Sequence, residues 1–472
     1  MSDKPSPEDL PPAYFLSLTL ENVRCFGPEQ TLDLTNEEGD PAQWTVLLGD
    51  NGTGKTTLLQ TISVMEIEVQ WDDEMEDMTG DTFPEDEEYW RLDPAISRLR
   101  EKGAGVNFQR SEMEISTLSA KYFSGGGLDS PEDGSELPDE FELTQKGKRG
   151  GSFGGYPEPN KIGSLFCVGY GASRAMQKRV SAGGLESKEG SSTISLFQDT
   201  EPLPNAEEWL YSLDYAAKSG KEVARKKLSQ VSSVLSDSDE GILPDVDDLR
   251  FRESEDDTSP PYVEFHTYYG WVTLDQLSLG YRTMIAWVVD LARRLFERYP
   301  DSDNPLTEPA VCLVDEIDLH LHPRWQRKII EFLGDRFKNT QFIVTAHSPL
   351  VVQAAQDANI ALLKRVENPD GDDYVEIHND MEPVGNLRVD QILTSDLYGL
   401  ESARPPQLDR LLEERQEILA KSELTKEDEK RLDEIEEGIG DLPAGETKEQ
   451  REAMDFIKDV ADRLEKEGDT TS

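Results

Sequence analysis

Short apolar runs and alternating stretches predict three strands at the start of the chain. Residues 15–20 alternate apolar and polar side chains, which is typical of a strand buried on one face. Residues 30–34 predict a second strand, and the continuous apolar run 44–48 predicts a fully buried third strand. That run leads directly into a glycine-rich turn, and we expect a helix over 56–67 to follow it.

A second series of strands and helices is predicted after residue 160. The apolar spacing indicates strands at 164–170, 263–266, 271–274, 310–314 and 341–345, and helices at 206–217 (continuing in pieces to 234), 281–299 and 323–337. Strands that alternate with helices in this way predict an α/β domain with a parallel sheet.

Three regions do not fit this alternation. Residues 1–13 are polar and proline-rich, and we expect a disordered tail there. Ten of the seventeen residues in 72–88 are acidic, and 123–160 is dense in Gly, Ser, Pro and Asp, with one short strand expected at 140–144. The sequence therefore predicts an acidic, loop-rich insertion over 72–160, and another acidic linker near 236–248.

The last part of the chain predicts a charged helical extension over 405–472, which follows a larger domain at 14–404. Three apolar stripes indicate a helical hairpin and one more helix: Leu408, Leu411, Leu412, Ile418 and Leu419; then Leu432, Ile435 and Ile439; then Met454, Ile457, Ala461 and Leu464. Either these helices pack on their own chain or they bind a partner, and the sequence leaves both open.

The charge balance narrows the classes of function. Asp and Glu number 97 against 48 Lys and Arg, which gives a formal net charge of −49. A protein that coats nucleic acid needs a basic face, so any DNA contact is expected to be local, at 146–149 or 225–227. The sequence has no apolar run of 18 residues, no signal peptide, and three scattered cysteines in apolar runs, Cys25, Cys167 and Cys312. We expect a cytoplasmic protein with reduced cysteines and no membrane contact.

The glycine-rich turn fits the phosphate-loop pattern G-x-x-x-x-G-K-[ST] over residues 49–56. Backbone N–H groups of such a loop surround the β-phosphate, and the following helix adds positive charge from its N-terminus. Lys55 is expected to reach the β- and γ-phosphates, and the Thr56 hydroxyl to bind Mg²⁺. The predicted ATP-binding residues here are Gly49, Asp50, Asn51, Gly52, Gly54, Lys55, Thr56 and Thr57.

Two adjacent carboxylates follow the apolar strand 310–314. Ligands of open α/β sheets bind at the carboxyl ends of the strands, where these side chains must lie. Asp315 is the expected Mg²⁺ residue, and Glu316 is positioned to deprotonate an attacking water. An Asp-Glu pair at a strand end is a weak signal alone, but together with the phosphate loop it is a strong one.

Three other polar residues complete the expected site. Ser278 and Gly280 begin a predicted helix and form a second anion-binding site, which makes sense if two subunits pack head-to-tail around ATP. His347 follows the strand 341–345 and is expected to contact a γ-phosphate. His320 and His322 suggest a metal site by composition, but a role in a turn and interface is favoured.

The order of these motifs resembles the ABC-type ATPase head shared by RecF, SMC and DNA-repair ATPases. The stretches 315–323 and 342–349, with 169–174 and 387–402, are similar to a narrower bacterial group called AAA family ATPases. That group includes the ATPase subunits of Septu-like and retron-associated anti-phage systems and the ATPase half of OLD-family nucleases. The resemblance covers residues 14–66 and 162–404.

The resemblance implies a fold: α/β; P-loop NTPase, ABC-type ATPase head with an inserted acidic region and a C-terminal helical extension. It also implies that Lys55 and Thr56 bind ATP and Mg²⁺, that Ser278 and Gly280 act in trans, that Glu316 is the catalytic base and that His347 is a switch residue. Leu279 and Tyr281 depart from the residues common in relatives, and no glutamine-loop equivalent is evident.

The expected function is a Mg²⁺-dependent ATPase switch that works as a head-to-tail homodimer. The chain after residue 361 is too short for an OLD-type nuclease domain, so any DNA cleavage is expected from a separately encoded effector, such as a small nuclease. An ATP-binding scaffold with little hydrolysis remains an alternative, and a transporter nucleotide-binding subunit is a weaker one.

Overall fold

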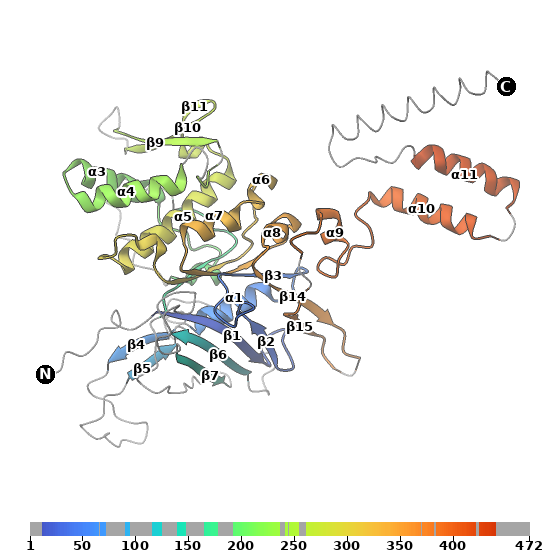
Figure 1. Cartoon of the computed structure of the whole chain (residues 1–472), viewed down its shortest axis with the longest axis horizontal. Helices are drawn as coiled ribbons and strands as arrows, with labels where there is room; N and C mark the ends of the chain where they lie inside the picture. The colour runs from blue at the N-terminus through green and yellow to red at the C-terminus, as the bar shows by residue number, and fades with distance from the viewer. Residues whose placement is uncertain are drawn as a thin grey trace, which may run out of the picture. The chain divides into compact units, whose positions relative to one another are not determined.

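The computed structural model describes residues 12–65, 67–71, 90–94, 116–124, 139–147, 165–177, 192–236, 241–243, 245–253, 261–369, 371–381, 384–421 and 424–439. The chain forms two compact units, Met1–Ile392 and Leu393–Ser472, which we call the head and the tail (Figure 1). The predicted domain boundary lies at residue 404, whereas the first unit ends within helix α9 (Val389–Leu393). In the described ranges, no helix is long and apolar enough to cross a bilayer.

A six-stranded sheet forms the centre of the head. Its order is β15-β14-β3-β13-β12-β8, and all strands are parallel except the edge strand β15. The strands are β3 (Trp44–Gly49), β8 (Cys167–Tyr170), β12 (Ala310–Val314), β13 (Thr340–Thr345), β14 (Asn359–Val366) and β15 (Tyr374–His378). β12 and β13 are buried along their whole length, as their continuous apolar runs predict. This sheet confirms the predicted α/β class.

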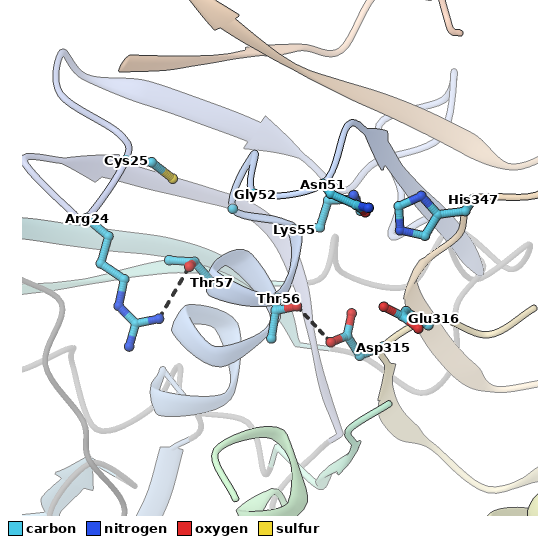
Figure 2. Close-up of a pocket in the computed structure, with 11 residues that line it drawn as sticks. Arg24, Cys25, Asn51, Gly52, Lys55, Thr56, Thr57, Asp315, Glu316 and His347 are labelled. Atoms are coloured by element: carbon cyan, nitrogen blue, oxygen red, sulfur yellow. Dashed lines mark hydrogen bonds between the residues drawn. The ribbon is translucent and has the colours of Figure 1, made fainter. Parts of the chain in front are cut away.

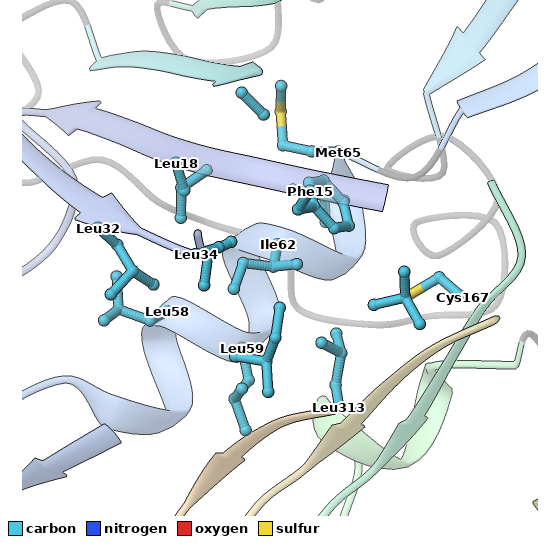
Figure 3. Packing of buried hydrophobic residues seen from close by; sticks show 14 of the residues in the cluster. Phe15, Leu18, Leu32, Leu34, Leu58, Leu59, Ile62, Met65, Cys167 and Leu313 are labelled. Carbon is cyan, nitrogen blue, oxygen red and sulfur yellow. The ribbon is translucent and has the colours of Figure 1, made fainter. Parts of the chain in front are cut away.

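A second, antiparallel sheet has the order β2-β1-β6-β7, with β1 (Ala13–Glu21), β2 (Gln30–Asp33), β6 (Ser116–Ser124) and β7 (Asp139–Gly147). Helix α1 (Lys55–Val64) packs between this sheet and the parallel one, and Figure 3 shows its Leu58, Leu59 and Ile62 in one apolar cluster with residues of β1 and β12. The Gln341 side chain joins the sheets, because its amide accepts from Phe15 N at 2.9 Å and donates to Phe15 O at 2.8 Å.

The region 72–160 departs from the loop-rich insertion that the sequence predicts. It supplies β5 (Trp90–Pro94), which pairs with β4 (Ile67–Trp71), and also β6 and β7. Only the strand at 140–144 was expected. β6 pairs with β1 along its length and buries Ala120 and Tyr122, so part of the expected insertion belongs to the core. The expected helix 56–67 ends at Val64, because β4 begins at Ile67.

Helices cover the other face of the parallel sheet. On α5 (Leu279–Arg298), Trp287 packs against the ring of Tyr170 from β8, and Asp290 accepts from the Tyr170 hydroxyl at 3.1 Å. α3 (Ala206–Lys218) and α4 (Glu222–Leu235) pack on α5. A small sheet of β9 (Val246–Arg252), β10 (Tyr262–Thr267) and β11 (Gly270–Thr273) lies beyond them in Figure 1, and β9 occupies part of the predicted linker 236–248.

The predicted helix 323–337 is two helices, α6 (Pro323–Gln326) and α7 (Ile329–Arg336). The Gln326 side chain donates to the carbonyl oxygens of Leu321 and Asp318, which ties the short α6 to the turn before it. α8 (Pro349–Ala354) follows β13 and completes the helices of the head before α9.

The tail contains α10 (Pro406–Leu419) and α11 (Lys426–Ile439), which carry the first two predicted stripes. Ile418 and Ile435 are the buried residues of these two helices, and Arg431 donates two hydrogen bonds, at 2.7 and 2.8 Å, to the carboxylate of Glu414. The third predicted stripe, 454–464, lies outside the described residues, as does the predicted N-terminal tail except for its last two residues.

Candidate functional site

The phosphate-loop sequence forms the connection between β3 and α1. Gly54, the residue before α1, has a φ of 88°, and a Cβ there would lie 2.4 Å from the sulfur of Cys25. Both the left-handed backbone and the close neighbour require glycine. The Thr53 hydroxyl donates to Asp50 O at 2.8 Å and closes the loop from inside. Two residues of the loop, Thr53 and Gly54, therefore help to determine its backbone conformation.

Lys55 is buried, and its side chain turns back along the loop. Its Nζ donates to the carbonyl oxygens of Gly49 at 2.7 Å and Asp50 at 2.9 Å. Burial lowers the pKa of Lys55, and the nearby carboxylates of Asp315 and Glu316 oppose that shift. The ammonium group thus lies among acceptors that a phosphate oxygen would replace.

Asp315 links the phosphate loop to two strands of the parallel sheet. One of its carboxylate oxygens accepts from the Thr56 hydroxyl at 2.7 Å (Figure 2). The other accepts from the Thr345 hydroxyl at 2.6 Å. A hydroxyl and a carboxylate in contact are hard oxygen donors of the kind that Mg²⁺ selects. Thr56 and Asp315 therefore fit a magnesium ion.

Glu316 follows Asp315 with a left-handed backbone, at a φ of 50°. Its N–H donates to the Thr345 hydroxyl at 2.7 Å, and its carbonyl oxygen accepts from Arg174 at 2.7 Å. These two bonds hold both main-chain polar groups of the residue. The side chain of Glu316 lies at the cavity beside the phosphate loop.

This cavity has a volume of about 350 Å³. Its lining includes most of the predicted site: Asn51, Gly52, Gly54, Lys55, Thr56, Thr57, Asp315, Glu316 and His347. Gly49 and Asp50 take part through the carbonyl groups that hold Lys55. Residues that are 259 positions apart, Thr56 and Asp315, thus meet in one site.

His347 also lines the cavity, and Figure 2 shows its ring near Asn51 of the phosphate loop. It follows β13, and its main-chain N–H donates to both carboxylate oxygens of Asp318 at 3.2 Å. The other two histidines of this region, His320 and His322, form part of turns. His322 Nδ1 accepts from Arg324 N at 3.3 Å at the start of α6, and the His320 carbonyl faces Gly280.

Ser278 and Gly280 are not among the residues that line the cavity in the described part of the chain. Ser278 is exposed at the start of α5, and Leu279 has 51% of its surface exposed. A Cβ at Gly280 would lie 2.4 Å from the carbonyl oxygen of His320, so the backbone of the turn before α6 passes directly over this position. A single chain therefore does not bring the two predicted anion-binding sites together.

Two lining residues were not predicted, Arg24 and Cys25. They lie in the turn between β1 and β2, where Arg24 donates to Gln60 Oε1 at 2.7 Å and to the Thr57 hydroxyl at 3.3 Å. Cys25 is half-buried in that turn and not in a strand, which corrects the expectation for it, whereas Cys167 and Cys312 are buried in strands. The signal that the sequence offered for this part of the site was a cationic residue, Arg24, between two predicted strands.

Comparisons with known proteins match the same parts of the chain. Residues 17–65 match a family model described as "AAA domain", and residues 200–353 match one described as "AAA domain, putative AbiEii toxin, Type IV TA system". The first segment runs from within β1 to just past the end of α1, and the second contains α5, β12 and β13. The chain is thus similar to AAA domains over two segments, which contain the Lys55, Glu316 and His347 of the cavity.

Three curated relatives extend these matches. The chain is 54% identical over 89 residues to "Retron Ec83 probable ATPase" of Escherichia coli, which covers 19% of this chain and 16% of that protein. It is 26% identical over 374 residues to "Septu protein PtuA" of Bacillus mycoides (79% and 43%). It is 33% identical over 145 residues to "Retron Vc95 probable ATPase" of Vibrio cholerae (30% and 27%). The chain spans less than half the length of each of these relatives.

These matches confirm the resemblance to Septu and retron ATPases. Among solved structures, an SMC head bound to the C-winged helix domain of ScpA is 15% identical, with a TM-score of 0.43 over 78% of this chain and 98% of that one. The α/β fold is evident from the sheet order and the phosphate loop of this chain.

Proposed function

We propose that this protein is a Mg²⁺-dependent ATPase that switches between states as it binds and hydrolyses ATP. The observation that carries the proposal is the 2.7 Å bond from Thr56 to Asp315, with Glu316 next in the chain. This bond supports the proposal because it joins the phosphate-loop hydroxyl to the proposed metal-binding carboxylate, and Glu316, the proposed general base, lines the same cavity.

Each side chain then has a defined task. Lys55 exchanges its bonds to Gly49 O and Asp50 O for the β- and γ-phosphate oxygens. Thr56 and Asp315 hold Mg²⁺, which neutralises phosphate charge when bound. Glu316 accepts a proton from the attacking water, and His347 donates to the γ-phosphate.

Glu316→Gln is the direct test of this assignment. The amide cannot accept the proton, so the steady-state rate of phosphate release should fall by about a hundredfold or more while Mg·ATP still binds. Glu297→Gln, on the exposed end of α5, is the matched control and should keep the wild-type rate. An unchanged rate in Glu316→Gln would remove Glu316 from the role of base.

The same assay separates catalysis from the alternative of an ATP-binding scaffold. A scaffold binds Mg·ATP with the same loop but releases little phosphate, with or without added DNA. Wild-type phosphate release no faster than the spontaneous hydrolysis of Mg·ATP under both conditions would favour the scaffold, whereas enzymatic release that Glu316→Gln leaves unchanged would speak only against Glu316 as the base.

We also propose that the active form is a head-to-tail homodimer in which Ser278 and Gly280 of one copy bind the γ-phosphate held by the other. The exposure of Ser278 and its absence from the cavity lining of its own chain, within the described residues, support this arrangement. A helix N-terminus supplies the positive potential that a phosphate requires.

We further propose that the ATPase controls a separately encoded effector, such as a small nuclease, in anti-phage defence. The names of the Septu and retron relatives support this role. The tail is the proposed docking site, because its two described helices bury only Ile418 and Ile435 as apolar residues and leave Leu419 half-exposed.

Deletion of residues 406–472 tests the docking site. The truncated chain keeps the whole head, so its affinity for Mg·ATP should change less than about twofold. Co-purification of a nuclease encoded beside the ATPase should be lost. A truncated chain that aggregates or loses ATP would instead indicate that the tail packs on the head, and one that retains the nuclease would place docking elsewhere.

A further inference from the structure

Arg174 is a buried cation behind the cavity, outside its lining. It follows β8 in the segment 169–174, and only 2% of its surface is exposed. One guanidinium nitrogen donates to the main-chain oxygen of Glu316 at 2.7 Å. Its Nε and its other terminal nitrogen have no hydrogen-bond partner within the residues that the structure describes. Within the described residues, the Arg174 side chain therefore hydrogen-bonds to the backbone of Glu316, the proposed general base.

The loop that carries Arg174 is fixed at several points. Tyr170 O, just before the loop, accepts from Asp315 N at 2.8 Å. The Ser195 hydroxyl bonds to Gly171 N at 3.3 Å and to Gly169 O at 2.8 Å. On the far side, Ala175 O accepts from Leu203 N at 2.8 Å. These bonds fix the backbone on both sides of Arg174, so its side chain can hold the segment that contains Glu316.

A buried arginine with unpaired N–H groups destabilises the fold unless nearby charges compensate. Burial lowers the pKa of Arg174 to about 10, and the carboxylates of Asp315, Glu316 and Asp318 oppose that shift. A group with that pKa stays protonated at neutral pH, so the charge persists beside three carboxylates. The chain retains this cation directly behind the acidic end of β12.

Glu316 needs such support, because its φ of 50° lies in the left-handed region that non-glycine residues seldom adopt. The Thr345 hydroxyl holds its N–H at 2.7 Å, and Arg174 holds its carbonyl. Together they fix the peptide groups on both sides of the Cα, and so the direction in which the carboxylate leaves the backbone.

We propose that Arg174 is a positioning residue that fixes the left-handed backbone of Glu316 and thereby aims the Glu316 carboxylate at the attacking water. The inference rests on the proposed ATPase function and assigns Arg174 no contact with ATP. A small displacement of a general base is enough to slow a reaction severely, by up to about a hundredfold per ångström.

The test compares Arg174→Gln and Arg174→Lys with wild type and with Glu316→Gln. Arg174→Gln should lower kcat by about tenfold to a hundredfold, while the Kd for Mg·ATP changes less than about threefold. Arg174→Lys keeps the charge and one donor and should show an intermediate kcat. Adding Arg174→Gln to Glu316→Gln should cause little further loss, because the two residues act through one carboxylate.

Arg294→Gln is the matched control, since Arg294 is another largely buried arginine, bonded to Asp290 at 2.7 Å on α5. It should lower the melting temperature without a selective loss of kcat. Equal falls in kcat, ATP affinity and melting temperature in Arg174→Gln would show a merely structural role. If Arg174→Gln does not fold, a wild-type kcat in Arg174→Lys overturns the inference.

The two proposals fail in different ways. A wild-type rate in Glu316→Gln overturns the general base and this inference with it. A slow Glu316→Gln beside a wild-type Arg174→Gln overturns only the positioning role, as does an additive loss in the double variant.

Discussion

Two parts of the head, the cavity at the phosphate loop and the start of α5, differ in how complete they are within one chain. On the first, Lys55, Thr56 and Asp315 are already joined by hydrogen bonds between 2.6 and 2.9 Å to groups of their own chain. On the second, Ser278 and Leu279 are exposed at the start of α5. The head thus has one preorganised binding site and one exposed surface.

The topology explains the difference. Parallel strands bring their carboxyl ends to one edge of a sheet, so the residues after β3, β12 and β13 meet without help from another chain. The start of α5 instead follows β11, which pairs antiparallel with β10 in the small sheet and is not a strand of the parallel sheet. Variants at the phosphate-loop cavity should therefore change ATP binding by a single subunit. Variants at the start of α5 should change only the formation and activity of the proposed dimer.

Lys55→Ala should have the largest effect. In the proposed ATP-bound state, the Lys55 ammonium leaves Gly49 O and Asp50 O and bonds to phosphate oxygens, and the alanine removes that group. Each hydrogen bond to a charged group contributes about 1.5–3 kcal/mol. The affinity for Mg·ATP should fall by at least about a hundredfold, measured by isothermal titration calorimetry. Lys226→Ala, which removes an exposed partner of Asp303, is the control and should bind normally. Normal ATP binding by Lys55→Ala would disprove the phosphate-loop assignment.

Ser278→Glu should have the next largest effect and should act only on the dimer. It is a better probe than a change at Gly280, where any side chain would collide with the His320 carbonyl of its own chain. The exposed carboxylate would meet the γ-phosphate of the second copy, so ATP-induced dimerisation should be lost and hydrolysis should fall at least about tenfold. ATP binding by the free subunit should not change, and Ser278→Ala controls for the lost hydroxyl.

A mixing experiment sharpens this result. A heterodimer of Ser278→Glu and Lys55→Ala has one site with an intact loop and an intact opposing serine. Its phosphate release, with dimerisation followed by light scattering, should exceed that of either parent alone. Activity no higher than the parents would contradict the head-to-tail arrangement and leave the single-chain site unaffected.

Thr345→Val should have the smallest of the three effects, within one subunit. The valine removes a hydroxyl that donates to Asp315 and accepts from Glu316 N, and thus leaves two buried polar groups unpaired. The free energy of unfolding should fall by about 1–3 kcal/mol, measured by urea denaturation, and more Mg²⁺ should be needed for half-maximal hydrolysis. Thr345→Ser, which keeps the hydroxyl, should restore the Mg²⁺ requirement.

The sequence predicted the parts of the site that are encoded by local patterns. The turn after β3 and the acidic pair after β12 have fixed spacing, and the parallel topology makes their meeting foreseeable. Arg24, Cys25 and Arg174 were missed as members of the site because their roles depend on which turn packs behind which strand. No spacing rule within one sequence carries that information.

The errors in the predicted fold have similar causes. β6 lies between acidic and glycine-rich stretches, and its place in the core depends on pairing with β1, almost a hundred residues earlier. The predicted helix 323–337 has a helical apolar pattern throughout, but the side-chain amide of Gln326 bonds back to Leu321 O and the helix breaks there. Tertiary contacts overrode the local pattern in both cases.

The position of β3 in the parallel sheet also determines how the chain must fold as it is synthesised. Both of its neighbours, β13 and β14, are translated about three hundred residues later. At about 5–20 residues per second, the ribosome reaches Phe342, the partner of Trp44 in β13, roughly 15–60 seconds after Trp44. During that interval the apolar strand Trp44–Gly49 has two unpaired edges, and a nascent chain with exposed edges tends to aggregate. The excess of acidic residues, which gives a net charge of −49 in the finished chain, keeps such unfinished chains apart by mutual repulsion.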